Sequence, residues 1–155
     1  MIVATPEEMA DLGGRVAAQL REGDLVTLNG ELGAGKTTLT RGIGAALGVR
    51  GAVTSPTFVL ARTHPRAEGA PLVHVDAYRL SSALELDDLD IDFAQSIVVV
   101  EWGAGLLDGV AENWLQLDIE RPAGGNLEDE VQPRRVTVTG HGERWADLSW
   151  LASDS

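Results

Sequence analysis

The sequence contains no cysteine, and this absence excludes several kinds of chemistry. The protein can form no disulfide bond, no zinc site with thiolate ligands and no cysteine nucleophile. Its three histidines are dispersed along the chain, which also argues against a metal site built from histidine. These absences suit a protein of the bacterial cytoplasm, and we expect that location.

Long hydrophobic runs are missing as well. No run in the sequence approaches the roughly 18 apolar residues that a membrane-spanning helix needs. Residues 1–9 place no basic residue before an apolar stretch and include Glu7 and Glu8, so no secretory signal is expected. Of the 155 residues, 44% are hydrophobic and 23% are charged. We therefore expect a single domain over residues 1–155, with a sizeable core and no membrane contact.

Basic residues are scarce compared with acidic ones. The chain has 12 lysines and arginines against 24 aspartates and glutamates, which gives a net charge of −12. Proteins that bind nucleic acid usually carry a basic face that neutralises phosphates. We therefore expect any contact with RNA to need a more basic partner. The acidity can instead serve solubility or steer the protein towards a basic surface of a partner.

One motif in the chain is highly informative. Residues 30–37 match the P-loop pattern G-x-x-x-x-G-K-[ST] at every fixed position. Its glycines let successive backbone N–H groups point at phosphate oxygens. Lys36 can reach the β- and γ-phosphates, and the Thr37 hydroxyl can ligate Mg²⁺. The sequence therefore predicts a site for a nucleoside triphosphate formed by Glu31, Leu32, Gly33, Ala34, Gly35, Lys36, Thr37 and Thr38.

The segments on both sides of the motif suit a P-loop. Residues 25–28 are a short apolar run with β propensity, entered from the turn-like residues 22–24. After the motif, Leu39 and Ile43 begin an apolar pattern at helical spacing that Gly48 can end. A strand before the loop and a helix after it argue against a glycine-rich turn that matches by chance.

The rest of the chain alternates between helical and extended patterns. Residues 6–21 form an amphipathic pattern, with Met9, Leu12, Val16 and Leu20 near one face. We further expect extended segments at 53–61, 72–75, 97–100, 115–119 and 135–139, a polar turn at 64–69, a short acidic helix at 81–89 and a mobile loop at 121–133. This order predicts a three-layer α/β sandwich of the P-loop type, with a mostly parallel sheet and late antiparallel strands.

Two acidic residues, Asp76 and Glu101, each follow an apolar strand. Ligands of parallel sheets bind beyond the carboxyl ends of the strands, and phosphoryl transfer depends on charge neutralisation by Mg²⁺. The run before Glu101 is the more uniformly apolar, as a central strand should be, so we assign Glu101 to Mg²⁺ beside Thr37. Asp76 then becomes a residue on the side of the γ-phosphate or one that positions the attacking water. Either carboxylate can instead cap a helix or pair with an arginine such as Arg79.

Two further features lie near these acids. Residues 54–57 can form a switch-like loop at the γ-phosphate, which would bring Thr57 to the nucleotide, or a strand bulge introduced by Pro56. Trp102, directly after Glu101, can pack beside the nucleotide, meet a partner or be a semi-buried tryptophan without a specific role.

Five short motifs occur in the order and rough spacing of a known family. They are residues 30–38, 54–58, 74–80, 85–89 and 99–102. The P-loop alone is generic, whereas the combination of Ser-Pro-Thr-Phe, Asp-x-Tyr-Arg-Leu and Glu-Trp is far more specific. On these motifs the chain resembles the TsaE family from about Leu12 to Trp102. Past Leu106 the match is weak, and Asp90 stands where the family usually has glycine.

The resemblance implies a small bacterial ATPase needed for the threonylcarbamoyladenosine (t6A) modification of tRNA. Members of the family bind ATP and Mg²⁺, hydrolyse ATP slowly alone and associate with the TsaB–TsaD pair, which transfers the threonylcarbamoyl group. Their hydrolysis resets that complex between turnovers, so tRNA would be met only indirectly. Together with the length of the chain, this leads us to expect one P-loop ATPase domain over residues 1–155.

The resemblance also implies roles for single residues at matching motif positions. Lys36 would bind phosphate and take part in catalysis, Thr37 and Glu101 would hold Mg²⁺, and Asp76 would be the catalytic or switch acid. In the same way, Thr57 and Trp102 would line the site or its partner-facing side. Arg135 lies beyond the matching region, and a contact between its side chain and the adenine is a separate prediction.

Two other functions are compatible with a P-loop of this kind. A small-molecule kinase would need an acceptor pocket and arginines on a lid, and only Arg62 and Arg66 lie in a suitable segment. A nucleotide-gated adaptor would bind ATP with negligible turnover and would keep its partner when hydrolysis is blocked.

Overall fold

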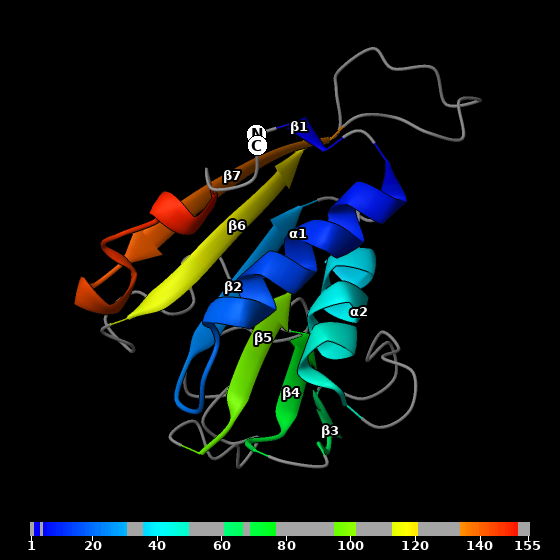
Figure 1. The fold of residues 1–155 in the computed structure, drawn as a ribbon, viewed down its shortest axis with the longest axis vertical. Coiled ribbons are helices and arrows are strands. Elements are labelled where there is room, and N and C mark those ends of the chain that lie inside the picture. The colour runs from blue at the N-terminus through cyan, green and yellow to red at the C-terminus, as the bar shows by residue number, and fades with distance from the viewer. Residues whose placement is uncertain are drawn as a thin grey trace.

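In the part of the chain that the structure describes, one seven-stranded sheet carries two α-helices on one face (Figure 1). The computed structural model describes residues 2–3, 5–30, 36–49, 61–66, 69–76, 95–101, 113–120 and 134–151. The strand order is β1-β7-β6-β2-β5-β4-β3. The elements are β1 Ile2–Val3, α1 Pro6–Gln19, β2 Leu25–Gly30, α2 Lys36–Leu47, β3 Ala61–His64, β4 Leu72–Asp76, β5 Ile97–Glu101, β6 Trp114–Glu120, β7 Arg134–His141, and the 3₁₀ helices η2 Glu143–Trp145 and η3 Ser149–Leu151.

The centre of the sheet is parallel and its edges are antiparallel. Strand β2 pairs in parallel with both β5 and β6, and β4 pairs in parallel with β5. At one side β7 runs antiparallel to β6 and β1 antiparallel to β7, while at the other side β3 runs antiparallel to β4. The predicted α/β class, with a mostly parallel sheet and late antiparallel strands, is confirmed. The described α-helices lie on one face of the sheet, and the third layer of the predicted sandwich stays a prediction.

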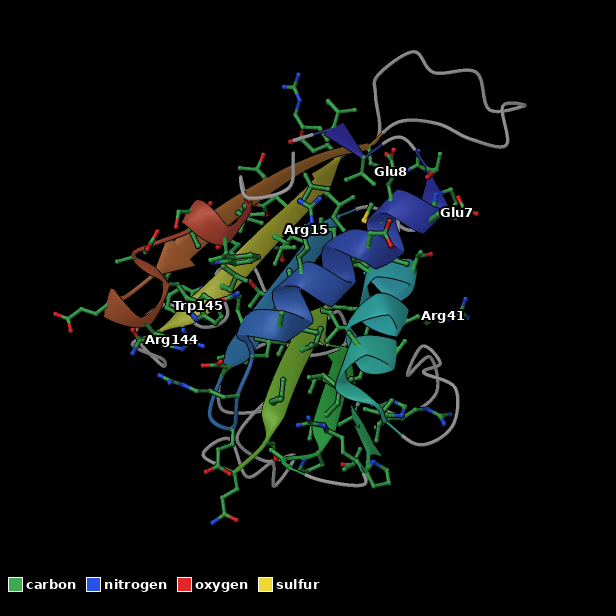
Figure 2. All side chains as sticks on the ribbon, viewed as in Figure 1. Glu7, Glu8, Arg15, Arg41, Arg144 and Trp145 are labelled. Atoms are coloured by element: carbon green, nitrogen blue, oxygen red, sulfur yellow. The ribbon has the colours of Figure 1, made fainter. Side chains whose placement is uncertain are left out.

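Helix α1 begins and ends at local signals in the sequence. The Thr5 side chain caps the helix by accepting a 3.1 Å hydrogen bond from the backbone N–H of Glu8, and Pro6 stands in the first turn. Figure 2 shows Glu7 and Glu8 at this end of α1, where their charge favours the helix dipole. The helix ends before Leu20, whose backbone is extended, so the predicted helix over 6–21 is slightly too long.

Most of the other expected elements lie where the pattern placed them. Helix α2 starts inside the P-loop motif and ends before Gly48, whose positive φ of 74° suits glycine. Strands β2, β4, β5, β6 and β7 contain the predicted segments and are slightly longer. The acidic helix expected at 81–89 and the mobile loop expected at 121–133 lie outside the described residues.

The region around β3 differs from the prediction. We expected a polar turn from His64, but His64 is the last residue of β3, paired with Leu72 and buried. The extended segment expected at 53–61 reaches the described residues only at Ala61, where β3 begins. Strand β1 and the two 3₁₀ helices were not predicted, because such short elements carry no periodicity.

The hydrophobic core lies between the sheet and the two helices. Val26 and Leu28 of β2 pack there with Leu39 and Ile43 of α2, all fully buried. The helices meet through glycine: a Cβ added at Gly42 would lie 2.4 Å from the carbonyl oxygen of Ala10. At Gly13 it would lie 2.5 Å from the Leu39 carbonyl oxygen. Backbone therefore contacts backbone where α1 crosses α2. None of the described helices is long and apolar enough to cross a membrane.

An ion pair attaches the 3₁₀ helix η2 to the turn before β2. The Arg144 guanidinium donates from Nε to Asp24 Oδ1 at 3.1 Å and from Nη2 to Asp24 Oδ2 at 2.9 Å, and it also binds the Gln19 carbonyl. Its centre lies 4.2 Å from the centroid of the Trp145 ring, and Figure 2 shows the two side chains together. Trp145 is buried in the core, and the Arg144 guanidinium covers its ring.

Arg144→Ala is expected to lower the free energy of unfolding by about 1–3 kcal/mol, because it removes the charged partner of the buried Asp24 carboxylate. Urea unfolding followed by circular dichroism measures this loss. Arg41→Ala is the matched control, since Arg41 is exposed on α2 and lies far from this pair (Figure 2), and it should change stability by less than about 0.5 kcal/mol. Equal stability of the two variants would contradict the role of the ion pair.

Candidate nucleotide site at the carboxyl end of the sheet

Three parallel strands end side by side at one edge of the sheet. Strand β2 ends at Gly30, the first residue of the P-loop motif, and β5 and β4 end at Glu101 and Asp76. The register aligns Leu28 with Glu101 and Glu101 with Asp76. The two acids predicted from the sequence are therefore neighbours on adjacent strands, and Glu101 lies on the strand next to β2. This edge is where parallel sheets bind ligands.

The Lys36 side chain reaches back to Gly30, the first residue of the P-loop motif. Lys36 is the first residue of α2 and is 6% exposed, and its Nζ donates a 2.7 Å hydrogen bond to the carbonyl oxygen of Gly30. The Thr40 hydroxyl donates to the Lys36 carbonyl at 2.8 Å, within the first turns of the helix. Helix α2 thus begins inside the motif as predicted, and the partial positive charge of its amino end lies at the motif.

The entry to the loop is anchored from the next strand. Asn29, directly before the motif, donates from Nδ2 to Asp118 Oδ1 of β6 at 3.0 Å. Gln116 donates from Nε2 to the other oxygen of Asp118 at 2.9 Å and contacts His141 Nε2 at 3.0 Å. These polar residues lie on the sheet face away from the two helices, because Leu28 and Leu117 between them face the core. They hold the end of β2 in place, and the sequence analysis missed them.

Glu101 is a buried carboxylate on the same face as α2. It is 4% exposed, and its register partner Leu28 packs in the core under the helices. Its Oε2 lies 3.1 Å from Nε2 of His74, whose side chain has no exposed surface. This approach is close but not aligned as a hydrogen bond. His74 interrupts the apolar strand around it, and that interruption is the sequence signal that could have revealed the contact.

A second histidine lies beside the first. His64 of β3 is buried, and its Nε2 has no hydrogen-bond partner among the described residues. Burial lowers the pKa of His64 below the ordinary value of 6.5, and the neighbouring His74 and Arg62 lower this pKa further. His64 is therefore a neutral imidazole at neutral pH. Since His64 aligns with Leu72 and His74 follows Leu72 by two residues, both histidines share the face of Glu101.

The residues at this edge fit a magnesium–nucleotide complex. Mg²⁺ prefers oxygen ligands and is commonly held by one or two carboxylates together with phosphate oxygens. Glu101 supplies a buried carboxylate next to the strand that enters the P-loop. The described residues contain no group of three or more histidine, aspartate or glutamate side chains that would hold a metal alone. An ion that shares its ligands with a bound nucleotide does not need such a group.

Arg135 lies at the same edge but on a more distant strand. It aligns with Glu120 of β6 and Ile2 of β1, two strands from β2. Val136, the next residue, packs in the core, so Arg134 shares the face of the helices and Arg135 points to the other face. The contact between Arg135 and adenine stays a prediction, and Arg134 is the arginine of β7 on the side of α2.

Several predicted site residues fall outside the described residues, namely Glu31, Leu32, Gly33, Ala34, Gly35, Thr57 and Trp102. Thr37 and Asp76 lie in α2 and β4, but their side chains are not described. Thr38 lies in the first turn of α2 and is half-buried. The residues that the structure brings together are thus Lys36, Glu101 and the backbone positions of Thr37 and Asp76.

Comparisons with known proteins agree with this arrangement. The model of the family described as "Threonylcarbamoyl adenosine biosynthesis protein TsaE" matches residues 3–128. A TsaE protein of Streptomyces coelicolor is 62% identical over 150 residues, which covers 93% of this chain and 99% of the relative. A TsaE protein of Bacillus subtilis is 38% identical over 147 residues, which covers 92% of this chain and 86% of the relative. Both relatives are named "tRNA threonylcarbamoyladenosine biosynthesis protein TsaE".

A solved structure shares the fold as well. The structure described as "Crystal structure of Bacillus subtilus YdiB" superimposes with a TM-score of 0.71 at 32% identity, covering 94% of this chain and 86% of that one. The match extends past the P-loop and both acidic strand ends to most of the sheet. Sequence, fold and the placement of the motif residues therefore lead to one conclusion: the chain belongs to the TsaE family.

Proposed function

We propose that this protein is a magnesium-dependent ATPase that supports t6A modification of tRNA by acting on a TsaB–TsaD pair. The role in t6A biosynthesis rests on the family to which the chain belongs. The observation that carries the ATPase proposal is the buried Glu101 carboxylate on β5, next to the strand that leads into Lys36 and the P-loop.

The chain's own residues have distinct parts in this proposal. Lys36, which now donates to the Gly30 carbonyl, would exchange that acceptor for phosphate oxygens of ATP. Thr37 and Glu101 would hold Mg²⁺, which neutralises phosphate charge during transfer to water. Asp76, aligned with Glu101 on the neighbouring strand, would orient the water. The partly desolvated setting of Glu101 strengthens its attraction to a cation.

The charge of the chain supports an indirect role in tRNA modification. With a net charge of −12, the protein repels the phosphate backbone of RNA and would leave tRNA binding to its partners. ATP hydrolysis would then reset the TsaB–TsaD complex between turnovers. The TsaB–TsaD partners, rather than the tRNA, would then respond to the nucleotide state of this protein.

The first experiment is the rate of ATP hydrolysis, alone and with the purified TsaB–TsaD pair. Slow turnover alone that rises when the pair is added is the expected result. ATP-dependent phosphorylation of a small molecule would instead assign the protein to the kinases. If the protein binds the pair but hydrolyses no ATP either alone or with the pair, it would be a nucleotide-gated adaptor.

Glu101→Gln is expected to lower the hydrolysis rate by about 100-fold or more, because the metal matters most as charge develops in the transition state. ATP binding should weaken much less. Glu120→Gln is the matched control, since Glu120 is an exposed carboxylate at the end of β6, and it should hydrolyse ATP at the unchanged rate. Full magnesium-dependent turnover in Glu101→Gln would transfer the metal assignment to Asp76.

A further inference from the structure

We infer that His74 is a positioning residue that holds the Glu101 carboxylate for its metal ligand role. This inference rests on the proposed function. The observation is the 3.1 Å approach of His74 Nε2 to Glu101 Oε2, between side chains that are 0% and 5% exposed. Because both side chains have almost no access to solvent, bulk water does not compete for this contact.

The register of the sheet sets this contact. His74 on β4 aligns with Val99 on β5, and Glu101 follows Val99 by two residues on the same face. The imidazole and the carboxylate are therefore diagonal neighbours across two parallel strands. His64 stands on the far side of His74, so the histidine has one carboxylate beside it and a neutral ring on the other side.

The chemistry of imidazole defines what His74 can do. A ring nitrogen donates only when it carries a proton, so a hydrogen bond to Glu101 requires a proton on Nε2. Oε2 would then be committed to His74, and Oε1 would remain for the metal or for a water bound to it. Hydrogen bonds in nucleotide sites are often poorly aligned before the ligand binds, and this contact would align when the ligand loads the site.

Stability alone does not account for a histidine at this position. Both ring nitrogens of His74 are buried without an aligned hydrogen-bond partner among the described residues. Such groups destabilise a fold, and an aliphatic residue would continue the buried run formed by Leu72, Val73 and Val75. Carboxylates that ligate metals are, in contrast, usually supported by a hydrogen bond from a second residue.

The test measures metal affinity directly, by titrating Mn²⁺ into the protein with a non-hydrolysable ATP analogue and following the free ion by electron paramagnetic resonance. His74→Leu should weaken Mn²⁺ binding by about 10–100-fold, while affinity for the metal-free analogue in EDTA changes by less than about threefold. His74→Gln, whose side-chain amide can donate to Glu101, should recover most of the loss. His64→Leu is the matched control and should bind Mn²⁺ like the unaltered protein.

Several results would overturn the inference. They are unchanged Mn²⁺ affinity in His74→Leu, or an equal loss of analogue affinity with and without the metal. If His74→Leu does not fold, His74→Asn replaces it, because its shorter amide does not span the contact; Mn²⁺ affinity equal to that of His74→Gln would then overturn the inference. A ¹⁵N NMR spectrum with the proton of His74 on Nδ1 would also contradict the donor role.

Glu101→Gln separates this inference from the proposed function. If Glu101→Gln weakens Mn²⁺ binding and His74→Leu does not, the inference is overturned and the metal assignment stands. If neither change affects Mn²⁺ binding, the metal assignment in the proposed function is wrong and the role of His74 is overturned with it.

Discussion

Lys36→Ala is expected to weaken ATP binding by about 10–100-fold, as the loss of charge-assisted hydrogen bonds to phosphate costs about 1.5–3 kcal/mol. Lys36 is the only basic residue in residues 30–38, and its ammonium group is buried at the start of α2. No other cation of the motif can replace it. Isothermal titration calorimetry with ATP and Mg²⁺ measures the change.

The control for this variant is a second basic residue on the same helix. Arg41 is exposed and lies on the outer side of α2 (Figure 2), so Arg41→Ala should bind ATP with unchanged affinity. Lys36→Ala should also keep its fold, because Lys36 lies at the first position of α2 and its removal leaves the apolar core residues of that helix unchanged. Unchanged ATP affinity in folded Lys36→Ala would refute the nucleotide site.

Gly42→Ala is expected to lower the free energy of unfolding by about 3 kcal/mol, even though alanine favours helix by about 1 kcal/mol over glycine. The added Cβ would lie 2.4 Å from the Ala10 carbonyl oxygen and 2.8 Å from the Ala10 Cα. Both are backbone atoms of α1, so the clash is relieved only if the helices move apart. Urea unfolding followed by circular dichroism measures the loss.

Gly14→Ala is the matched control for this prediction. Gly14 also lies in a helix, but a Cβ there would meet its nearest neighbour, the Ala46 Cβ, at 4.0 Å. This variant should be as stable as the unaltered protein or more stable, by up to about 1 kcal/mol. If both variants stabilise the protein, the close crossing of α1 and α2 is wrong. Because α2 also carries Lys36, Gly42→Ala should weaken ATP binding as well.

Features that depend on local chemistry could be predicted from the amino-acid sequence. The P-loop pattern is complete within residues 30–37, and it predicts a phosphate site without knowledge of the fold. The caps of α1 at Thr5 and of α2 at Gly48 act on the backbone next to them, so both helices could be predicted. The apolar runs before Asp76 and Glu101 likewise predicted strands β4 and β5 and the acids at their ends.

Contacts between residues far apart in the sequence, in contrast, depend on how the whole chain folds. The contact of His74 with Glu101 depends on the register of β4 against β5, and the pairing of Arg144 with Asp24 joins residues 120 positions apart. The approach of Gly42 to Ala10 depends on how two helices cross. Each arrangement arises from pairing and packing across the whole chain, which local propensity does not encode. The position of a carboxylate can therefore be predicted from its strand, whereas the histidine beside it is revealed only by the folded sheet.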